Sequence, residues 1–137
     1  MRILVMDAQG GGVGKQLVTA IKKDMPDSYV TAVGTNTAAT AAMMKAGADE
    51  AATGENPVKV GCRKADIIVG PVGIVIADSL GGEVTPDMAL AVAQSSARRV
   101  LIPFNQCDNI IAGVSDLSTS VLIKSAVNEI KKYACED

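Results

Sequence analysis

The sequence predicts an α/β fold in which a mostly parallel sheet is covered by helices on both faces. Continuous apolar runs, typical of strands buried on both sides, alternate along the chain with segments whose apolar residues recur at helical spacing. The first apolar run leads into a glycine-rich loop, and a helical segment follows the loop directly. Strands that alternate with helices indicate a doubly wound sheet, here a single Rossmann-like three-layer sandwich.

The first half of the chain contains two strand and helix units in succession. Arg2–Asp7 is an apolar run typical of a buried strand, and residues 14–25 carry apolar side chains on one helical face. Tyr29–Gly34 repeats the strand pattern. Asn36 or Thr35 can then cap a second helix, because both side chains can accept a hydrogen bond from the first turn.

The second half continues the alternation. Residues 49–53 are interpreted as a short third strand, and a proline near the start of residues 55–65 favours a helix there. Residues 66–70 are a strong strand, and Thr85, followed by proline and aspartate, predicts the start of another helix. Residues 73–80, between these two elements, are apolar and β-branched, and we expect a buried helical turn.

Two further strands are expected near the end of the chain, over residues 100–104 and 110–114. The five residues that join them are too few for a parallel crossover, so the sequence predicts one antiparallel edge strand. Ser118 begins a final helix that extends to about Tyr133. No composition shift marks a domain boundary, so residues 1–137 are expected to form one domain.

Composition excludes several classes of chemistry. The 137 residues include no histidine, no tryptophan, one phenylalanine and two tyrosines, and 48% of them are hydrophobic. Without histidine, Ser-His-Asp and Cys-His arrangements and imidazole metal sites are impossible within the chain. A net charge of −2 and so few aromatic rings also speak against nucleic acid as a partner.

The cysteines and the apolar stretches bear on location and assembly. Cys62, Cys107 and Cys135 lack a C-x-x-C spacing, and we expect them to be reduced thiols in a cytoplasmic protein. Residues 67–77, the longest uncharged apolar stretch, are too few to span a bilayer. High apolar content in a small domain instead favours a subunit interface, in a homo-oligomer such as a dimer or tetramer.

The glycine-rich loop is the first candidate binding site. Glycines between a strand and a helix let backbone N–H groups approach an anion at the helix N-terminus. The dinucleotide pattern G-x-G-x-x-G is not matched, whereas G-x-x-x-G-x-G is matched in part by Ala8, Gly12 and Gly14. The candidate residues in this loop are Gln9, Gly10, Gly11, Gly12, Val13, Gly14 and Lys15.

Two other strand ends complete the expected crevice. Thr35 and Asn36 follow the second strand and can bind a ribose or phosphate, although helix capping is an equal alternative. The absence of Asp or Glu at that strand end lowers the odds of NAD. Gly70, Pro71 and Gly73 follow the fourth strand and would lie beside the first loop if the strand order reverses there.

A catalytic residue is not assigned. Asp7, Asp78 and Glu83 are the carboxylates expected nearest the crevice, but spacing does not pair them as acid and base. A P-loop ATPase is a weaker alternative, since the loop contains a GGxGK core. Gln16 stands where that motif needs a hydroxyl for Mg²⁺, and no later strand ends in an acidic residue.

Several motifs in order resemble a family of small bacterial proteins known as a domain of unknown function. The motifs are residues 7–16, 34–36, 46–49, 52–56 and 70–78. The resemblance brings no activity with it, and the family has glycine where this chain has Ala8. From the residues themselves we expect a protein that binds a nucleotide, a dinucleotide or another phosphorylated small molecule. The alternative from a different class is a non-catalytic oligomeric scaffold or regulatory subunit.

Overall fold

The computed structural model describes residues 1–104 and 108–136, and its centre is a five-stranded sheet of order β3-β2-β1-β4-β5. The strands are β1 (Arg2–Asp7), β2 (Tyr29–Gly34), β3 (Glu50–Thr53), β4 (Ile67–Pro71) and β5 (Arg98–Ile102). The helices are α1 (Gly12–Asp24), α2 (Thr37–Lys45), α3 (Glu55–Lys64), α4 (Pro86–Gln94) and α5 (Thr119–Cys135), with a 3-10 helix η1 (Val72–Val75) after β4. All four strand pairings are parallel.

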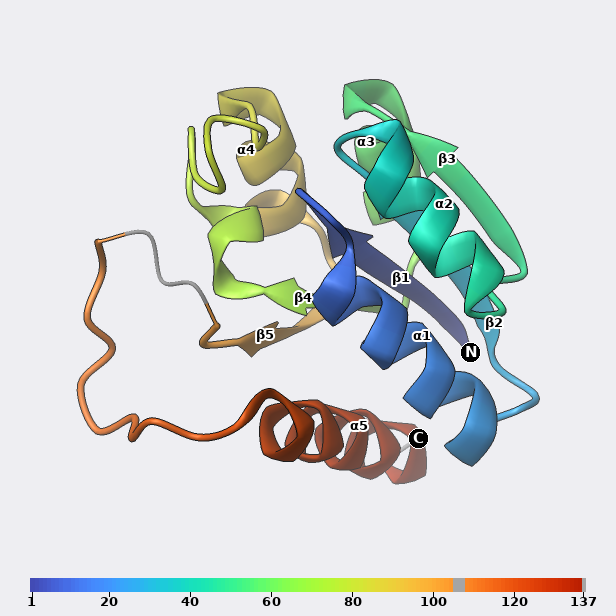
Figure 1. Cartoon of the computed structure of the whole chain (residues 1–137). Helices are drawn as coiled ribbons and strands as arrows, with labels where there is room; N and C mark the ends of the chain where they lie inside the picture. The colour runs from blue at the N-terminus through green and yellow to red at the C-terminus, as the bar shows by residue number, and fades with distance from the viewer. Residues whose placement is uncertain (105–107, 137) are drawn as a thin grey trace.

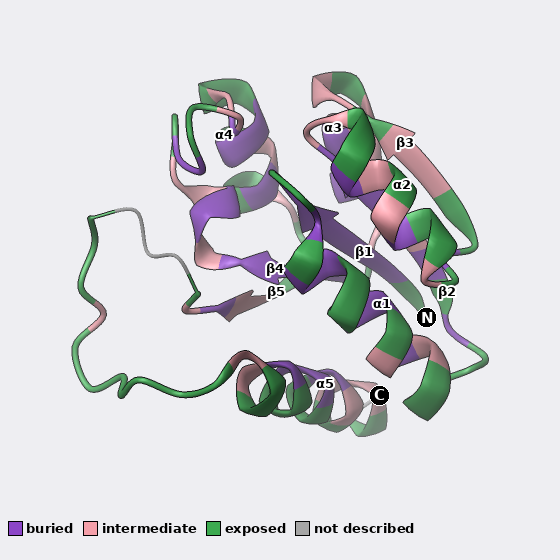
Figure 2. Cartoon of the chain, in the orientation of Figure 1, coloured by how far each residue is buried: buried purple, intermediate pink, exposed green. Residues whose placement is uncertain are grey.

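The helices form a layer on each side of the sheet, with α1, α2 and α5 on one face and α3 and α4 on the other (Figure 1). Alternate residues of β1 separate the two cores. Ile3 and Val5 pack with residues of α1 and α5, while Leu4 and Met6 pack with residues of α3 and α4. The central strand is therefore buried on both faces, as its continuous apolar run predicts (Figure 2).

Helix starts follow the side chains that can cap them. The side chain of Asn36 accepts a hydrogen bond from the amide of Ala39 at the start of α2. Thr85 and Ser118 cap α4 and α5 in the same way. These three predictions are confirmed, because local hydrogen bonding alone is enough to set each helix start. The short third strand is also present, as β3.

The predicted antiparallel edge strand is wrong. Residues 110–114 form turns and irregular chain instead of a strand, and β5 ends at Ile102. Ile110 is 95% exposed, and Gly113 has a φ of 83°, which interrupts an extended segment. An apolar run of five residues therefore did not specify a strand here, and the sheet in the described ranges is entirely parallel.

The segment between β4 and α4 is helical only in part. Residues 72–75 form η1, and a series of turns then leads to α4. Asp78 and Leu80 have φ values of 62° and 54°, and the two glycines that follow are also left-handed. The prediction of a helix over residues 73–80 thus holds only for the first turn, because the later residues leave helical geometry.

None of the helices in the two described ranges is long and apolar enough to cross a membrane.

Candidate functional site at the carboxyl end of the sheet

The glycine-rich loop joins β1 to α1 at the point where the strand order reverses. β1 lies between β2 and β4, so the chain leaves the sheet in opposite directions on its two sides. The amide of Gly11 donates to the carbonyl of Ala8 at 3.0 Å, and Gly11, with a φ of 72°, precedes the first residue of α1. Open α/β sheets place their ligands beside such a reversal.

The glycines of the loop differ in the space around them. A Cβ on Gly11 would lie 2.8 Å from the Cα of Ala39, and one on Gly14 would lie 2.8 Å from the Cβ of Asp7. These two glycines therefore permit close packing of α1 against α2 and β1. A Cβ on Gly10 or Gly12 would meet no atom within 4 Å. Packing within the chain does not explain why these two positions lack a side chain.

The carboxylate of Asp7 lies at the N-terminus of α1. Asp7 is only 5% exposed, and its oxygens accept hydrogen bonds from the amides of Ala8 at 2.8 Å and Gly14 at 2.6 Å. Burial raises the pKa of Asp7, the backbone hydrogen bonds oppose the rise, and the charge of Glu83 adds to it. Asp7 thus already binds the amide of Gly14 in the first turn of α1.

Glu83 joins the loop to the end of β2. One of its carboxylate oxygens accepts hydrogen bonds from the Gln9 amide at 2.9 Å, the Thr35 hydroxyl at 2.7 Å and the Asn36 side chain at 2.6 Å. The Asn36 side chain also donates to the Gln9 carbonyl at 2.9 Å. The hydrogen bond from Thr35, followed by those from Gln9 and Asn36, lowers the pKa of Glu83 against the opposing effect of its burial.

The sequence does not reveal the role of Glu83. Sequence reasoning places the residue near the crevice but assigns it no partner, because Glu83 lies in a turn whose contacts are 47 to 74 residues distant along the chain. The one hint in the sequence is that no acidic residue follows β2, which leaves the carboxylate expected at that strand end to come from another segment. A carboxylate does lie at that strand end, but it is supplied by the segment between η1 and α4.

A cavity of about 170 Å³ opens above the loop. Its wall is formed mainly by the β1–α1 loop and by single residues from four other segments. The lining residues are Asp7, Ala8, Gln9, Gly10, Gly11, Gly12, Val13, Gln16, Pro71, Leu80, Phe104 and Thr119. Two of the three strand ends expected to meet, those of β1 and β4, therefore border one cavity.

Six of the residues predicted for the site line this cavity and six do not. The lining residues among them are Gln9, Gly10, Gly11, Gly12, Val13 and Pro71. Thr35 and Asn36 bind Glu83 instead, and Asn36 also caps α2.

The four other predicted residues lie outside the cavity wall for separate reasons. Gly14 packs against Asp7 and Met43, and Gly70 lies against the Met6 carbonyl. The carbonyl of Gly73 accepts a hydrogen bond from the Ser79 hydroxyl. Lys15 is exposed and lines a different groove, between α1 and α5.

The polar groups of the site combine donors and acceptors. Within the described chain, the amides of Gly10 and Gly12 have no hydrogen-bond partner, and they lie at the positive end of α1. The carboxylates of Asp7 and Glu83 lie close by. The site is therefore suited to a ligand that carries both an anionic group and hydroxyl donors.

Nucleophilic and metal chemistry find little support in the described residues. Cys62 is buried in the α3 core, and burial raises the pKa of its thiol to about 11. No three acidic or cysteine side chains of the described ranges are grouped so that they could hold a metal ion. Cys107, which the sequence predicts to be a reduced thiol, lies outside the described residues.

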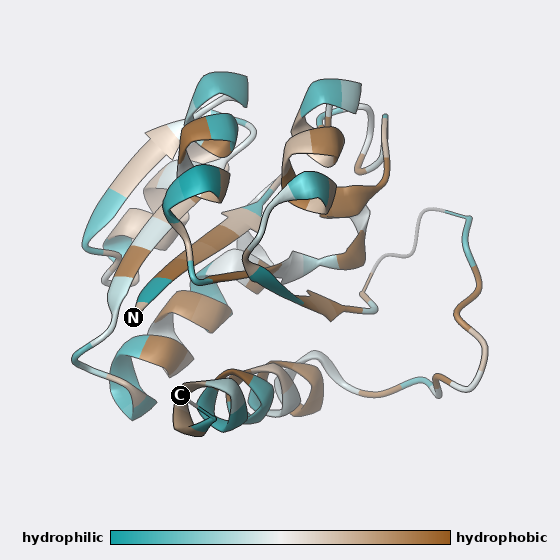
Figure 3. Ribbon diagram, turned by 180° about the vertical axis from the view of Figure 1, so that it is seen from behind, coloured by the Kyte–Doolittle hydropathy of each residue, from teal (hydrophilic) through white to brown (hydrophobic). Residues whose placement is uncertain are grey.

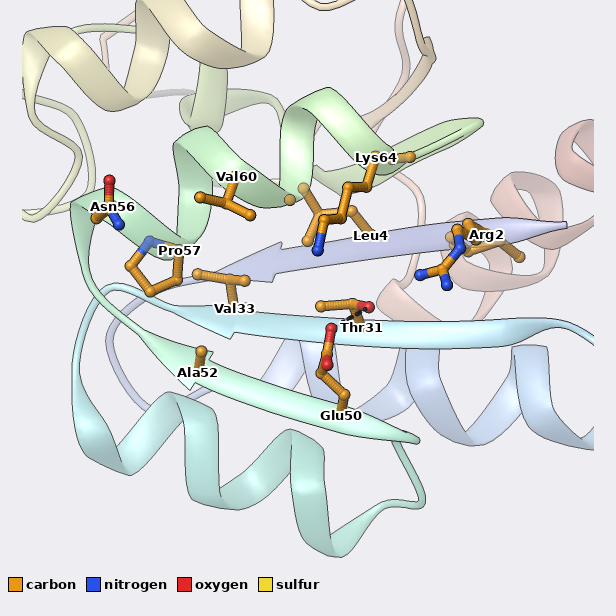
Figure 4. Close-up of a pocket in the computed structure, with 13 residues that line it drawn as sticks. Arg2, Leu4, Thr31, Val33, Glu50, Ala52, Asn56, Pro57, Val60 and Lys64 are labelled. Carbon is orange, nitrogen blue, oxygen red and sulfur yellow. Dashed lines mark hydrogen bonds between the residues drawn. The ribbon is translucent and has the colours of Figure 1, made fainter.

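A larger cavity, of about 290 Å³, lies on the opposite face of the sheet. It lies between α3 and the strands β1, β2 and β3, and Figure 4 shows Lys64 and Glu50 reaching into it from opposite sides. The Thr31 hydroxyl donates to Glu50 at 3.1 Å. The glycine-rich loop and the N-terminus of α1 do not line this cavity, and Asn56, Pro57 and Gly61 of α3 line it instead. Its greater volume alone does not make it the better candidate.

The fold and the loop define the class of protein: a parallel α/β protein of Rossmann-like type with a glycine-rich loop after its first strand. The chain belongs to the family described as Domain of unknown function (DUF3842), whose model matches residues 2–135. The resemblance drawn from the sequence motifs is thereby confirmed. A comparison with curated protein sequences gave no significant match.

Solved structures with similar folds share little sequence with this chain. AibC is 20% identical with a TM-score of 0.50 over 96% of this chain, and a Pseudomonas aeruginosa nucleoside-diphosphate-sugar epimerase, PA4631, is 15% identical with a TM-score of 0.51 over 95%. The chain spans 41% and 46% of their respective lengths. A dodecameric FMN-dependent Ubix-like decarboxylase from Escherichia coli O157:H7 is 14% identical, with a TM-score of 0.47 over 97% of this chain and 94% of its own. These similarities concern the fold alone.

Proposed function

We propose that this protein binds a nucleotide or another phosphorylated small molecule in the cavity above the glycine-rich loop. The observation that carries the proposal is the pair Gly10 and Gly12, whose amides lack partners in the described chain and whose Cβ positions are open. Both glycines line the cavity at the N-terminus of α1. Backbone amides at a helix N-terminus are a common means of holding a phosphate.

Asp7 and Glu83 define which phosphorylated molecules are favoured. Two carboxylates beside the loop repel a free phosphate ion, so the ligand gains most if its hydroxyl groups donate to a carboxylate while its phosphate meets the glycine amides. In Rossmann sites an acidic residue at the end of the second strand binds the ribose hydroxyls. We assign the corresponding role to Glu83, which Thr35 and Asn36 hold at that strand end just beyond the residues that line the cavity. A nucleotide is therefore favoured over inorganic phosphate.

The ATPase alternative is weakened by the environment of the loop. The Gln16 side chain donates to the Gly12 carbonyl at 3.2 Å, so it occupies the position of the expected hydroxyl with a different contact. Lys15 faces the groove between α1 and α5, although a P-loop lysine must reach the phosphates. We therefore propose binding without assigning phosphoryl transfer.

The test is a thermal-shift panel on the intact protein. The panel comprises AMP, ADP with Mg²⁺, NAD, FMN, ribose 5-phosphate and inorganic phosphate. A ligand at one hundred times its dissociation constant stabilises the folded state by about 2.7 kcal/mol, which is a measurable rise in melting temperature. We expect a rise with at least one nucleotide and none with inorganic phosphate.

Two variants assign the effect to the loop. Gly12 is the first residue of α1, and Gly12→Val places a side chain in the open space beside it. This variant should abolish the rise in melting temperature while the fold persists. Thr37→Val introduces the same side chain at the exposed first residue of α2 and should leave the shift unchanged. The absence of any shift in the wild type, or a shift that survives in Gly12→Val, would contradict the proposal.

A further inference from the structure

The segment of residues 108–117, called the arm below, extends away from the sheet and its helices (Figure 1), except that its first residue, Asp108, lines a pocket with residues 76–81. It lies between β5 and α5 and carries a run of apolar residues, visible as brown stretches of the projecting chain in Figure 3. Ile110 is 95% exposed, Val114 41% and Leu117 50%. The arm thus presents several aliphatic side chains that neither core cluster contains.

While these side chains stay in water, the isolated chain lacks the favourable free energy that their burial would supply. Burying an isoleucine side chain is among the larger favourable contributions to folding or association. A contiguous apolar segment left in water usually marks an interaction site. The arm therefore needs an apolar surface to cover it.

A suitable surface is the groove between α1 and α5. It has a volume of about 520 Å³, and its floor is formed by the half-buried Ala20 and by Ile123 and Val127, which are only 6% and 2% exposed. Three lysines, Lys15, Lys23 and Lys124, also line the groove. Among the described residues none of these lysines forms an ion pair, whereas Asp24, at the same groove, is already paired with Lys131 at 3.1 Å.

The charges of the arm complement those of the groove. Asp108 and Asp116 flank the apolar run, and neither is ion-paired within the described chain. An apolar segment with a carboxylate at each end matches an apolar floor bordered by unpaired lysines. We propose that the arm of one copy of this chain binds in the α1–α5 groove of a second copy, and that the exchange is reciprocal.

The second copy is preferred as partner because one chain carries both halves of the contact. The arm and the groove adjoin at the start of α5, where Leu117 and Val121 are also about half exposed, at 50% and 49%. A two-fold dimer buries the same patch on both subunits, so it requires a surface that is complementary to itself. A foreign partner would need only the arm or only the groove.

This interface would border the candidate ligand site without forming part of it. Phe104 and Thr119, on either side of the arm in the sequence, line the cavity above the glycine-rich loop. The inference does not depend on that cavity binding a ligand, because it rests on the exposure of the arm and on charges elsewhere.

Sedimentation velocity on the full chain, from low to high micromolar concentration, tests the interface. We expect the wild type to form a dimer, or a larger assembly that contains it. Ile110→Asp should raise the dimer dissociation constant by about tenfold or more, because it places an unpaired charge in an apolar contact. Leu90→Asp, at a residue of α4 that is 52% exposed, is the matched control and should leave the assembly unchanged.

A charge exchange identifies the partner surface. Asp108→Lys with Asp116→Lys reverses the arm, and Lys23→Glu with Lys124→Glu reverses the groove. Each double variant alone should be monomeric, whereas a mixture of the two should form a heterodimer, because each arm then meets a groove of opposite charge. A monomeric wild type, an Ile110→Asp variant that still dimerises, or a mixture that stays monomeric would each overturn the inference. A monomeric wild type would show that the arm packs within its own chain or on a different protein.

Discussion

Asp7 and Glu83 show how neighbouring carboxylates of one site acquire different properties. Asp7 is buried and loses its hydration, so its pKa is raised although backbone amides bind it. Glu83 is less buried and accepts three hydrogen bonds on one oxygen, so its pKa is lowered. The environment of each group, more than its chemical type, decides which of them is the more readily protonated.

Replacing Glu83 with glutamine should make the free energy of unfolding less dependent on pH. A carboxyl whose pKa is lowered in the folded state, below its ordinary value of 4.5, stabilises the fold above that value. The contribution disappears as the pH falls through the folded-state pKa. Glu83→Gln should therefore be less stable than the wild type by about 1 kcal/mol at pH 7, since a charged acceptor is lost.

The check is urea unfolding of both proteins between pH 7 and pH 3. The difference in free energy of unfolding should shrink as the pH falls below 4.5. A difference that stays constant over this range would show that Glu83 does not act through its charge.

Cys62 should be almost inert toward thiol reagents in the folded protein. Burial raises its pKa to about 11, so at pH 8 only roughly one thiol in a thousand is ionised. Cys135, which is exposed, is the internal comparison. Alkylation followed by peptide mass spectrometry should find Cys135 modified long before Cys62, and equal rates in the native state would contradict the assigned burial.

At the scale of the residue, sequence reasoning identifies local partners and misses distant ones. Asn36 caps α2 by a bond to a residue three positions away, and that role is one of the two expected for it. Its contact with Glu83 joins residues 47 positions apart and could not be predicted from either local sequence. Local capping follows from side-chain chemistry, whereas long-range contacts require the fold.

In the loop from β1 to α1, packing within the chain explains some of the glycines and leaves others unexplained. Gly11 has a positive φ and lies against the backbone of α2, whereas Gly12 occupies the first position of a helix with open space around it. Sequence alone predicts the loop and its place. It could not show which glycines are required for packing, because the difference between Gly11 and Gly12 arises from contacts with α2.

Substitution by alanine should separate these two glycines. Gly11→Ala should destabilise the protein by about 2 kcal/mol or more, because the side chain meets the Ala39 backbone in a left-handed conformation. Gly12→Ala should be neutral or stabilising by up to about 1 kcal/mol, since alanine fits a helical residue. Thermal or urea unfolding of the two variants is the measurement, and equal effects would refute the division of roles.

The start of α4 offers a second test at this scale. Thr85 accepts a hydrogen bond from the Met88 amide and donates to Glu55 at 2.6 Å, so it links α4 to α3. Thr85→Ala should cost about 1 kcal/mol of unfolding free energy. Ser96→Ala, at an exposed residue between α4 and β5, is a suitable control. A loss no greater than that of the control would show that the cap contributes nothing.

At the scale of the whole molecule, alternation of strands and helices is sufficient to predict a parallel α/β fold. The predicted antiparallel edge failed because residues 110–114 have a strand-like composition but lie away from the sheet, with Ile110 almost fully exposed. High apolar content favours a subunit interface without locating it. Among the described residues, Ile110, Val114 and Leu117 of the arm are exposed large hydrophobic side chains, and their exposure could not be foreseen without the structure.

The most direct test of ligand binding is a ¹H–¹⁵N NMR titration of this 14.0 kDa chain with the nucleotide that stabilises it most. The amide signals of Gly10 and Gly12 should shift strongly and saturate together, because both amides would donate to the ligand phosphate. Gly47, which lies between the end of α2 and the start of β3 at the opposite edge of the sheet, should shift little and serves as an internal reference. Saturating shifts confined to residues around Arg2, Glu50 and Lys64, or no shifts in the glycine-rich loop at all, would contradict the proposed site.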